Sequence, residues 1–252
     1  MRPLESLLTG LAGVCSSGAL RVGGSGVVYL LEGKVTYMES AETPGIEELL
    51  TGGGRVSPAD VDRAVTRREG GEPLFGEGLL SRDELAEQLR RAVLDAALVL
   101  FGTDAARPTF QPSERHWLGP HWHFEVDELI AECVRRSTRL DEVWPSDELD
   151  AAPVVPVSRL PGDRVTLSAR QWEVLVHADG TATPLQLARR LDTTAYTVLL
   201  AVRELAAADL LVKPRRAPAL PKRVPAPSGT EMRHEPVDLS LLRRLRSALE
   251  DL

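Results

Sequence analysis

Residues 18–39 constrain the fold of this chain more than any other segment; their sequence is GALRVGGSGVVYLLEGKVTYME. Three short β-prone runs, residues 19–22, 27–31 and 34–38, are separated by glycine-rich gaps. Apolar and less apolar side chains alternate along the runs, which is typical of a sheet wetted on one face. Glycine adopts positive φ at no steric cost, so the gaps are interpreted as hairpin turns. The segment therefore predicts a small antiparallel meander, which needs helices to cover it.

Amphipathic helices are predicted on both sides of this meander, so we expect an α+β fold. Ser57 before Pro58 and Ser81 before Glu84 are typical helix starts, because a serine side chain accepts a backbone N–H of the first turn. The segment beginning at Ser81 has the clearest helical pattern in the chain. Helices are expected at residues 3–14, 46–50, 58–65, 85–100 and 126–139, and short strands at residues 109–110 and 122–124.

Charge is distributed unevenly along the 252 residues. Residues 1–162 carry 16 Lys and Arg against 26 Asp and Glu, whereas residues 163–252 carry 14 against 11. An acidic segment repels polyanions, so any contact with nucleic acid is expected from the second part of the chain.

The cysteines and the hydropathy indicate a reducing, aqueous environment. Cys15 and Cys133 form neither a metal-binding spacing nor a disulfide framework, and both fall on apolar helical faces. We therefore expect two buried free thiols, as is usual in the cytosol. No run of about 18 apolar residues is present, so we predict no membrane span and a cytoplasmic location.

A second pattern begins at residue 164. Ser168 and Thr183 each precede a helix and are followed three residues later by glutamine, as in a capping box. The first of these helices is expected to bury Trp172, Leu175 and Val176. A third helix, capped at Asp192 or Thr193, precedes a strand at residues 209–213, and another strand is expected at residues 165–167. Three helices flanked by strands resemble a winged helix-turn-helix over residues 163–216.

The tail that follows has no packing periodicity until its end. Residues 213–236 are rich in proline, which predicts an extended linker. An amphipathic helix is expected at residues 238–252, and it either folds back onto its own domain or docks in a groove of a partner protein. Its apolar face consists of Leu239, Leu242, Leu245, Leu249 and Leu252.

The order of the motifs in residues 1–145 resembles the PatA-N-terminal (PATAN) family of bacterial signalling proteins. The motifs are a helix, the VYLLEGKV meander, a glycine-rich stop, the SPADVDRAV helix, the FGEGLLSRDELAEQL segment, a strand region with Phe110 and Phe124, and a helix ending in RRSTRLDE. The resemblance implies a non-enzymatic interaction or regulatory module, of a kind often joined to response-regulator or DNA-binding domains. The loop at residues 115–123 departs from the pattern because it is longer and more aromatic.

These patterns together predict five segments. Residues 1–145 are assigned to a PATAN-like regulatory domain, and residues 146–162, which contain three prolines, to a linker. The winged-helix-like domain follows at residues 163–216, then a proline-rich linker at 217–237 and the helix at 238–252.

The histidine-rich loop is the only candidate for a metal site. His116, His121 and His123 lie near Glu114, and two histidines in alternation would face the same side of a strand. The interleaved aromatic residues favour an ordinary packed loop instead. No local signature of a catalytic nucleophile appears, so we predict no enzyme activity, no cofactor and no metal.

The sequence leaves two functions open. The acidic first part, the terminal helix and a third helix poor in base-reading side chains favour a protein partner. The winged-helix pattern and the cations after it favour a DNA-binding transcriptional regulator. Under that alternative the nucleic-acid contacts would come from Thr193, Thr194, Thr197, Arg203, Lys213, Arg215, Arg216, Lys222 and Arg223.

Overall fold

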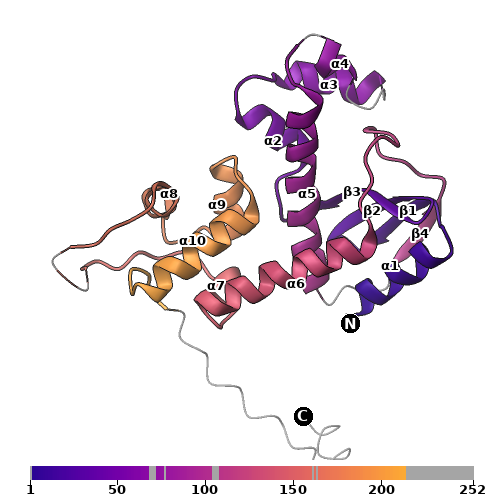
Figure 1. Ribbon diagram of the computed structural model, residues 1–252. Coiled ribbons are helices and arrows are strands. Elements are labelled where there is room, and N and C mark those ends of the chain that lie inside the picture. Colours follow the sequence, from indigo (N-terminus) through magenta and orange to yellow (C-terminus); the bar gives the residue numbers. More distant parts are fainter. Residues whose placement is uncertain are drawn as a thin grey trace, which may run out of the picture. The chain divides into compact units, whose positions relative to one another are not determined.

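The computed structural model of this chain describes residues 2–67, 72–76, 78–103, 108–160, 162 and 164–213. These residues belong to one compact unit, Met1–Pro214. The fold is mixed α+β, as predicted, with a four-stranded antiparallel sheet flanked by helices (Figure 1). The linker and terminal helix predicted at residues 217–252 lie outside the described residues.

The sheet contains the predicted meander. Strands β1 (Gly18–Val22), β2 (Gly26–Leu31) and β3 (Lys34–Ser40) pair in sequence, and β4 (Thr109–Pro112) joins the free edge of β1, giving the order β3-β2-β1-β4. Gly33, with φ of +82°, lies in the turn between β2 and β3, where a side chain would also meet the backbone of Ala12. The predicted strand at residues 122–124 is reduced to a single bridge, in which Phe124 pairs with Val35.

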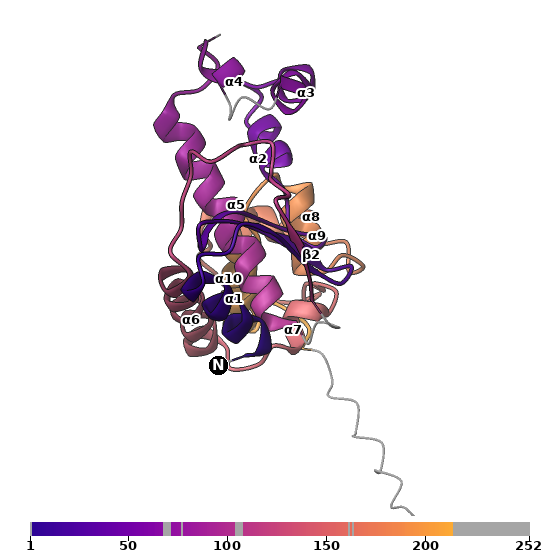
Figure 2. The same cartoon turned by 90° about the vertical axis from the view of Figure 1, so that its right-hand side faces the viewer.

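Helix α5 (Arg82–Gly102) forms the centre of the first apolar core. It packs along β3, as Figures 1 and 2 show, and buries Leu85, Leu89, Val93 and Leu100. The predicted capping box opens this helix, because Ser81 accepts the Glu84 N–H while the Glu84 carboxylate accepts the Ser81 N–H. The other helices of this part are α1 (Pro3–Gly13), α2 (Ile46–Gly52), α3 (Pro58–Arg67), α4 (Glu72–Gly76) and α6 (Val126–Val143).

A second apolar core lies among the helices that follow residue 145. They are α7 (Glu148–Ala151), α8 (Ala169–His177), α9 (Pro184–Arg190) and α10 (Ala195–Ala207). The capping boxes predicted at Ser168 and Thr183 are both present. After α10 the chain pairs with residues 155–157 through a bridge between Pro156 and Leu211. Residues 165–167 do not form the expected strand.

Three local expectations were wrong. Helix α8 turns Val174 inward and exposes Trp172 and Val176, which were expected to be buried, whereas Leu175 packs against the second core as predicted. Cys15 is exposed because α1 ends at Gly13 and the chain turns there with φ of +51° at Cys15; only Cys133 is buried. The N-cap of α10 is Thr194, not Asp192 or Thr193 as expected.

Candidate functional site around helix α10

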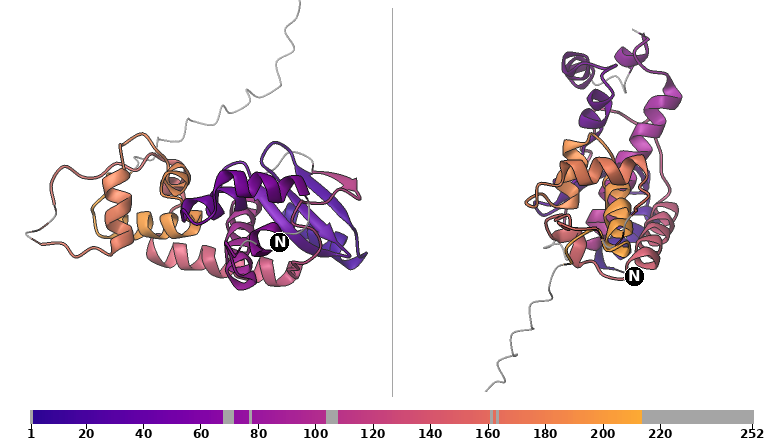
Figure 3. Two further views of the ribbon diagram at one scale, coloured as in Figure 1. Left: turned by 90° about the horizontal axis from the view of Figure 1, so that it is seen from above. Right: turned by 90° about the vertical axis from the view of Figure 1, so that its left-hand side faces the viewer.

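Helix α10 is enclosed by helices of the first apolar core and of the second. It packs against α8 and α9 on one side and against α6 and α5 on the other, and Figures 1 and 3 show it running beside α6. Within the described part of the chain, none of residues 195–206 is exposed. Its sequence explains this position, because alanine, valine and leucine occur around the whole circumference and such a helix is stable only when covered.

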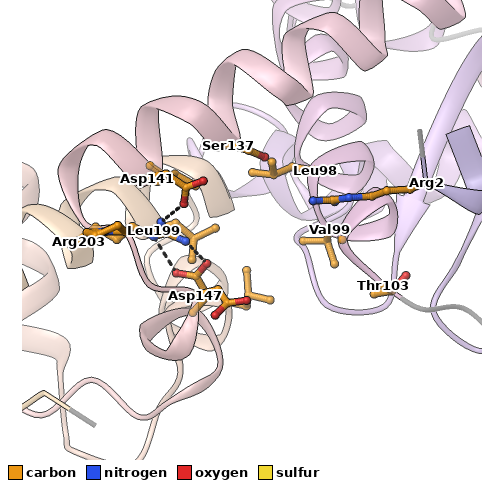
Figure 4. A pocket seen from close by; sticks show the side chains of 14 residues that line it. Arg2, Leu98, Val99, Thr103, Ser137, Asp141, Asp147, Leu199 and Arg203 are labelled. Atoms are coloured by element: carbon orange, nitrogen blue, oxygen red, sulfur yellow. Dashed lines mark hydrogen bonds and ion pairs between the residues drawn. The ribbon is translucent and has the colours of Figure 1, made fainter. Parts of the chain in front are cut away.

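Arg203 anchors α10 to the segment that joins the two cores. Arg203 is only 3% exposed, and its guanidinium donates from Nε and Nη2 to the two carboxylate oxygens of Asp150, at 3.1 and 2.6 Å. Nη1 donates to Asp141 at 2.9 Å and to the carbonyl of Trp144 at 2.8 Å. Figure 4 shows Arg203 and Asp141 at the wall of a cleft of about 620 Å³. Burial raises the pKa of Asp150, and the Arg203 guanidinium opposes that rise.

Asp95, on α5, binds the N-terminus of α10. It is 1% exposed, and its carboxylate accepts the backbone N–H groups of Ala195 and, at 3.3 Å, Tyr196. Arg136 also donates to it, at 3.4 Å. Burial raises the pKa of Asp95 to about 6, because desolvation outweighs these three hydrogen bonds. A titratable group thus lies in the contact between the first core and α10.

Four arginines line a second cleft, of about 540 Å³, beside the same helix end. We call it the arginine cleft and define it by Arg90 and Arg91 of α5, Arg136 of α6 and Arg170 of α8. The Arg136 guanidinium lies 4.6 Å from the ring centroid of Tyr196, a cation–π contact that joins α6 to α10.

The predicted nucleic-acid residues do not form one open surface. Thr193, Thr194 and Thr197 line the arginine cleft, and the Thr194 side chain caps α10 by accepting the Thr197 N–H at 3.4 Å. Arg203 is buried in its ion pairs. Lys213 is exposed, but it bonds Asp209 at 2.6 Å. Arg215, Arg216, Lys222 and Arg223, and the five leucines of the predicted partner helix, lie outside the described residues.

The histidine-rich loop packs as an ordinary aromatic cluster. The rings of His116 and Tyr37 stack with centroids 4.0 Å apart, and Trp117 donates from Nε1 to Glu47 at 2.7 Å. His121 and His123 are exposed. Among the described residues, no group of three or more His, Cys, Asp or Glu side chains is placed to hold a metal ion.

The sequence patterns did not reveal the important contacts of α10, although one signal was present. Asp95 is the sole charged residue in the run from Ala92 to Leu100, and a lone carboxylate on a buried helix normally has a specific partner. The partner itself, the N-terminus of a helix 100 residues later, has no local signature.

Comparisons with protein-family models, with curated proteins and with solved structures found no match to this chain. The PATAN resemblance therefore stays a prediction. In the described part of the chain, every helix is too short or too polar to cross a bilayer.

Proposed function

We propose that this chain is a non-enzymatic bacterial signalling or regulatory protein that acts in the cytoplasm through contacts with other proteins. In this proposal residues 1–145 form a PATAN-like input domain, and helices α8, α9 and α10 form a winged-helix-like output domain. The bridge between Pro156 and Leu211 supports the second assignment, because antiparallel pairing after the third helix is typical of a wing.

The observation that carries the proposal is the enclosure of α10. A helix-turn-helix protein reads DNA by placing one face of its recognition helix in the major groove, so that face must be free. Here α6 and α5 cover the side of α10 that α8 and α9 leave open, and Arg203 is committed to Asp150 and Asp141. This arrangement favours a protein-binding role over base reading.

Helix α8 offers the surface through which such a role would be exercised. Trp172 and Val176 are 60% and 57% exposed and, four residues apart, lie on one helical face. Exposed tryptophan is costly to hydrate and is enriched at the centres of protein interfaces. We assign this pair as the contact with the protein partner.

DNA binding through the winged-helix-like domain and the basic residues after it is the alternative function. The exposed position of Lys213, immediately before the segment that contains Arg215 and Arg216, favours it. This alternative requires α10 to separate from α5 and α6, because the face needed for the major groove is otherwise covered.

The test is a comparison of two matched double variants in quantitative crosslinking and affinity purification from the native cell. Trp172→Ser with Val176→Ser removes the α8 surface, while Val14→Ser with Val134→Ser removes exposed apolar groups elsewhere. Both pairs are largely exposed, so circular dichroism should show both variants folded. We expect the proteins recovered with the wild type to persist with the control and to be lost with the α8 variant. Equal recovery with both variants would contradict the assigned surface.

A further inference from the structure

The arginine cleft brings four guanidinium groups from three helices to one opening. Its volume of about 540 Å³ falls in the range of sites that hold small molecules. Arg90 and Arg91 are neighbours on α5, and Arg136 and Arg170 come from α6 and α8. Cations that line one cleft repel one another, so a cluster of this kind favours a bound anion.

The protein's own acids leave much of this hydrogen-bonding capacity unused. Arg90 and Arg91 both donate through Nε to Glu87, at 3.4 and 2.9 Å. Among the described residues, the Nη atoms of these two arginines have no acceptor. Arg170 donates one Nη1 bond to Glu173, at 2.6 Å. The hydrogen bond from Arg91 lowers the pKa of Glu87.

The remaining lining adds neutral donors and little apolar surface. Thr193, Thr194 and Thr197 contribute hydroxyl groups, and the Thr193 hydroxyl bonds to no described group. The backbone of Gly53 is open, since nothing lies within 4 Å of the position where its side chain would begin. A ligand therefore meets polar donors on several sides.

Each of the four arginines pairs with an acid, and Glu173, the partner of Arg170, does not line the cleft. Glu87 and Asp192 are the carboxylates among the lining residues, against four arginines. Asp95 and Glu132 both bond Arg136, but Asp95 is directed at the N-terminus of α10 and neither lines the cleft. Four arginines thus face two carboxylates among the lining residues, and Arg90 and Arg91, which share Glu87, keep one positive charge between them.

We propose that the arginine cleft binds a small phosphate-bearing molecule of nucleotide size, with its phosphate accepting from the free Nη atoms of Arg90 and Arg91. Planar guanidinium groups match phosphate oxygens in paired, charge-assisted hydrogen bonds. The rest of the ligand extends along α10 toward Tyr196 and Arg170. Because the cleft is formed by α5, α6, α8 and the start of α10, such a ligand would stabilise the closed position of α10.

The test is isothermal titration of the full chain with two probes, pyrophosphate and adenosine monophosphate. We expect at least one probe to bind with a Kd of about 0.1 mM or lower at near-physiological salt. Arg90→Gln with Arg91→Gln should weaken that binding about tenfold or more, because charge-assisted bonds are lost.

A matched control separates a site from general electrostatic attraction. Arg135→Gln with Arg139→Gln removes the same charge from exposed positions of α6 that do not line the cleft. We expect this control to change Kd by less than about twofold. Arg90→Lys with Arg91→Lys keeps the charge but loses the paired geometry, so it should show an intermediate loss. Absence of binding of both probes at about 5 mM, or equal weakening in the Gln variant and the control, would overturn the proposal.

Discussion

Replacing Asp95 by Asn tests the buried contact between α5 and the start of α10. The carboxylate of Asp95 accepts two backbone N–H groups of α10, yet burial raises its pKa from 3.8 to about 6. Asparagine has nearly the same shape and stays neutral at every pH. The variant therefore removes the ionisation of Asp95 while leaving the packing of α10 nearly unchanged.

The sign of the effect follows from the direction of this pKa. The folded protein holds the proton more tightly than the unfolded chain, so Asp95 favours folding at low pH and this contribution is lost as pH rises through about 6. The full rise corresponds to ~3 kcal/mol, of which about 2 kcal/mol falls between about pH 4.5 and about pH 7.5. Other titrating groups are common to both proteins and cancel in the difference.

Urea denaturation of the wild type and of Asp95→Asn at about pH 4.5 and about pH 7.5 measures the contribution of Asp95 ionisation to the free energy of unfolding, provided that unfolding is two-state. We expect the free energy of unfolding of the variant, relative to the wild type, to increase by about 2 kcal/mol from acid to neutral pH. A difference that does not change with pH would refute the reasoning. So would a change of opposite sign, which would mean that the ionised carboxylate is the form that stabilises α10.

Three further predictions concern named contacts. Arg203→Met removes a buried cation and leaves the half-buried carboxylate of Asp150 without its partner, so urea denaturation should show a loss of about 3 kcal/mol; a loss near zero would contradict a stabilising ion pair. Gly52→Ala should destabilise the protein by about 1–3 kcal/mol, because the new methyl group would lie 2.5 Å from the β-carbon of Asp192. Gly53→Ala should be nearly neutral, because the space at that position is open. Equal losses of stability in the two variants would contradict the close contact at Gly52. In the native protein Cys15 should react with maleimide while Cys133, whose pKa burial raises to about 12, should not; mass spectrometry distinguishes the two sites.

The parts of the fold that were predicted correctly depend on neighbouring residues. The meander follows from alternation and glycine-rich turns, and the capping boxes at Ser81, Ser168 and Thr183 follow from side chains three residues apart. Such patterns can be recognised in the sequence because the interacting groups are close along the chain. The short strand expected at residues 109–110 is present as β4, which extends to Pro112, although its pairing with β1 was not predicted.

The parts that failed depend on contacts between distant segments. Trp172 and Val176 were expected to be buried because large apolar residues usually are, but Val174 is the residue that meets the core. Arg203 was a candidate DNA contact because arginine suits that role, whereas Asp150 and Asp141 hold it inside. No spacing in the sequence indicates which surfaces of α10 are covered.

The proposed function depends most on whether α10 stays enclosed, and duplex-DNA binding by the full chain tests this directly. Binding to mixed genomic fragments would be measured at about 50 mM and about 200 mM salt. If α10 is covered, any binding comes from exposed cations and the phosphate backbone, so we predict that it is abolished at the higher salt. Tight binding that survives the higher salt would show base reading, and it would contradict a regulator that acts through protein contacts with α10 enclosed.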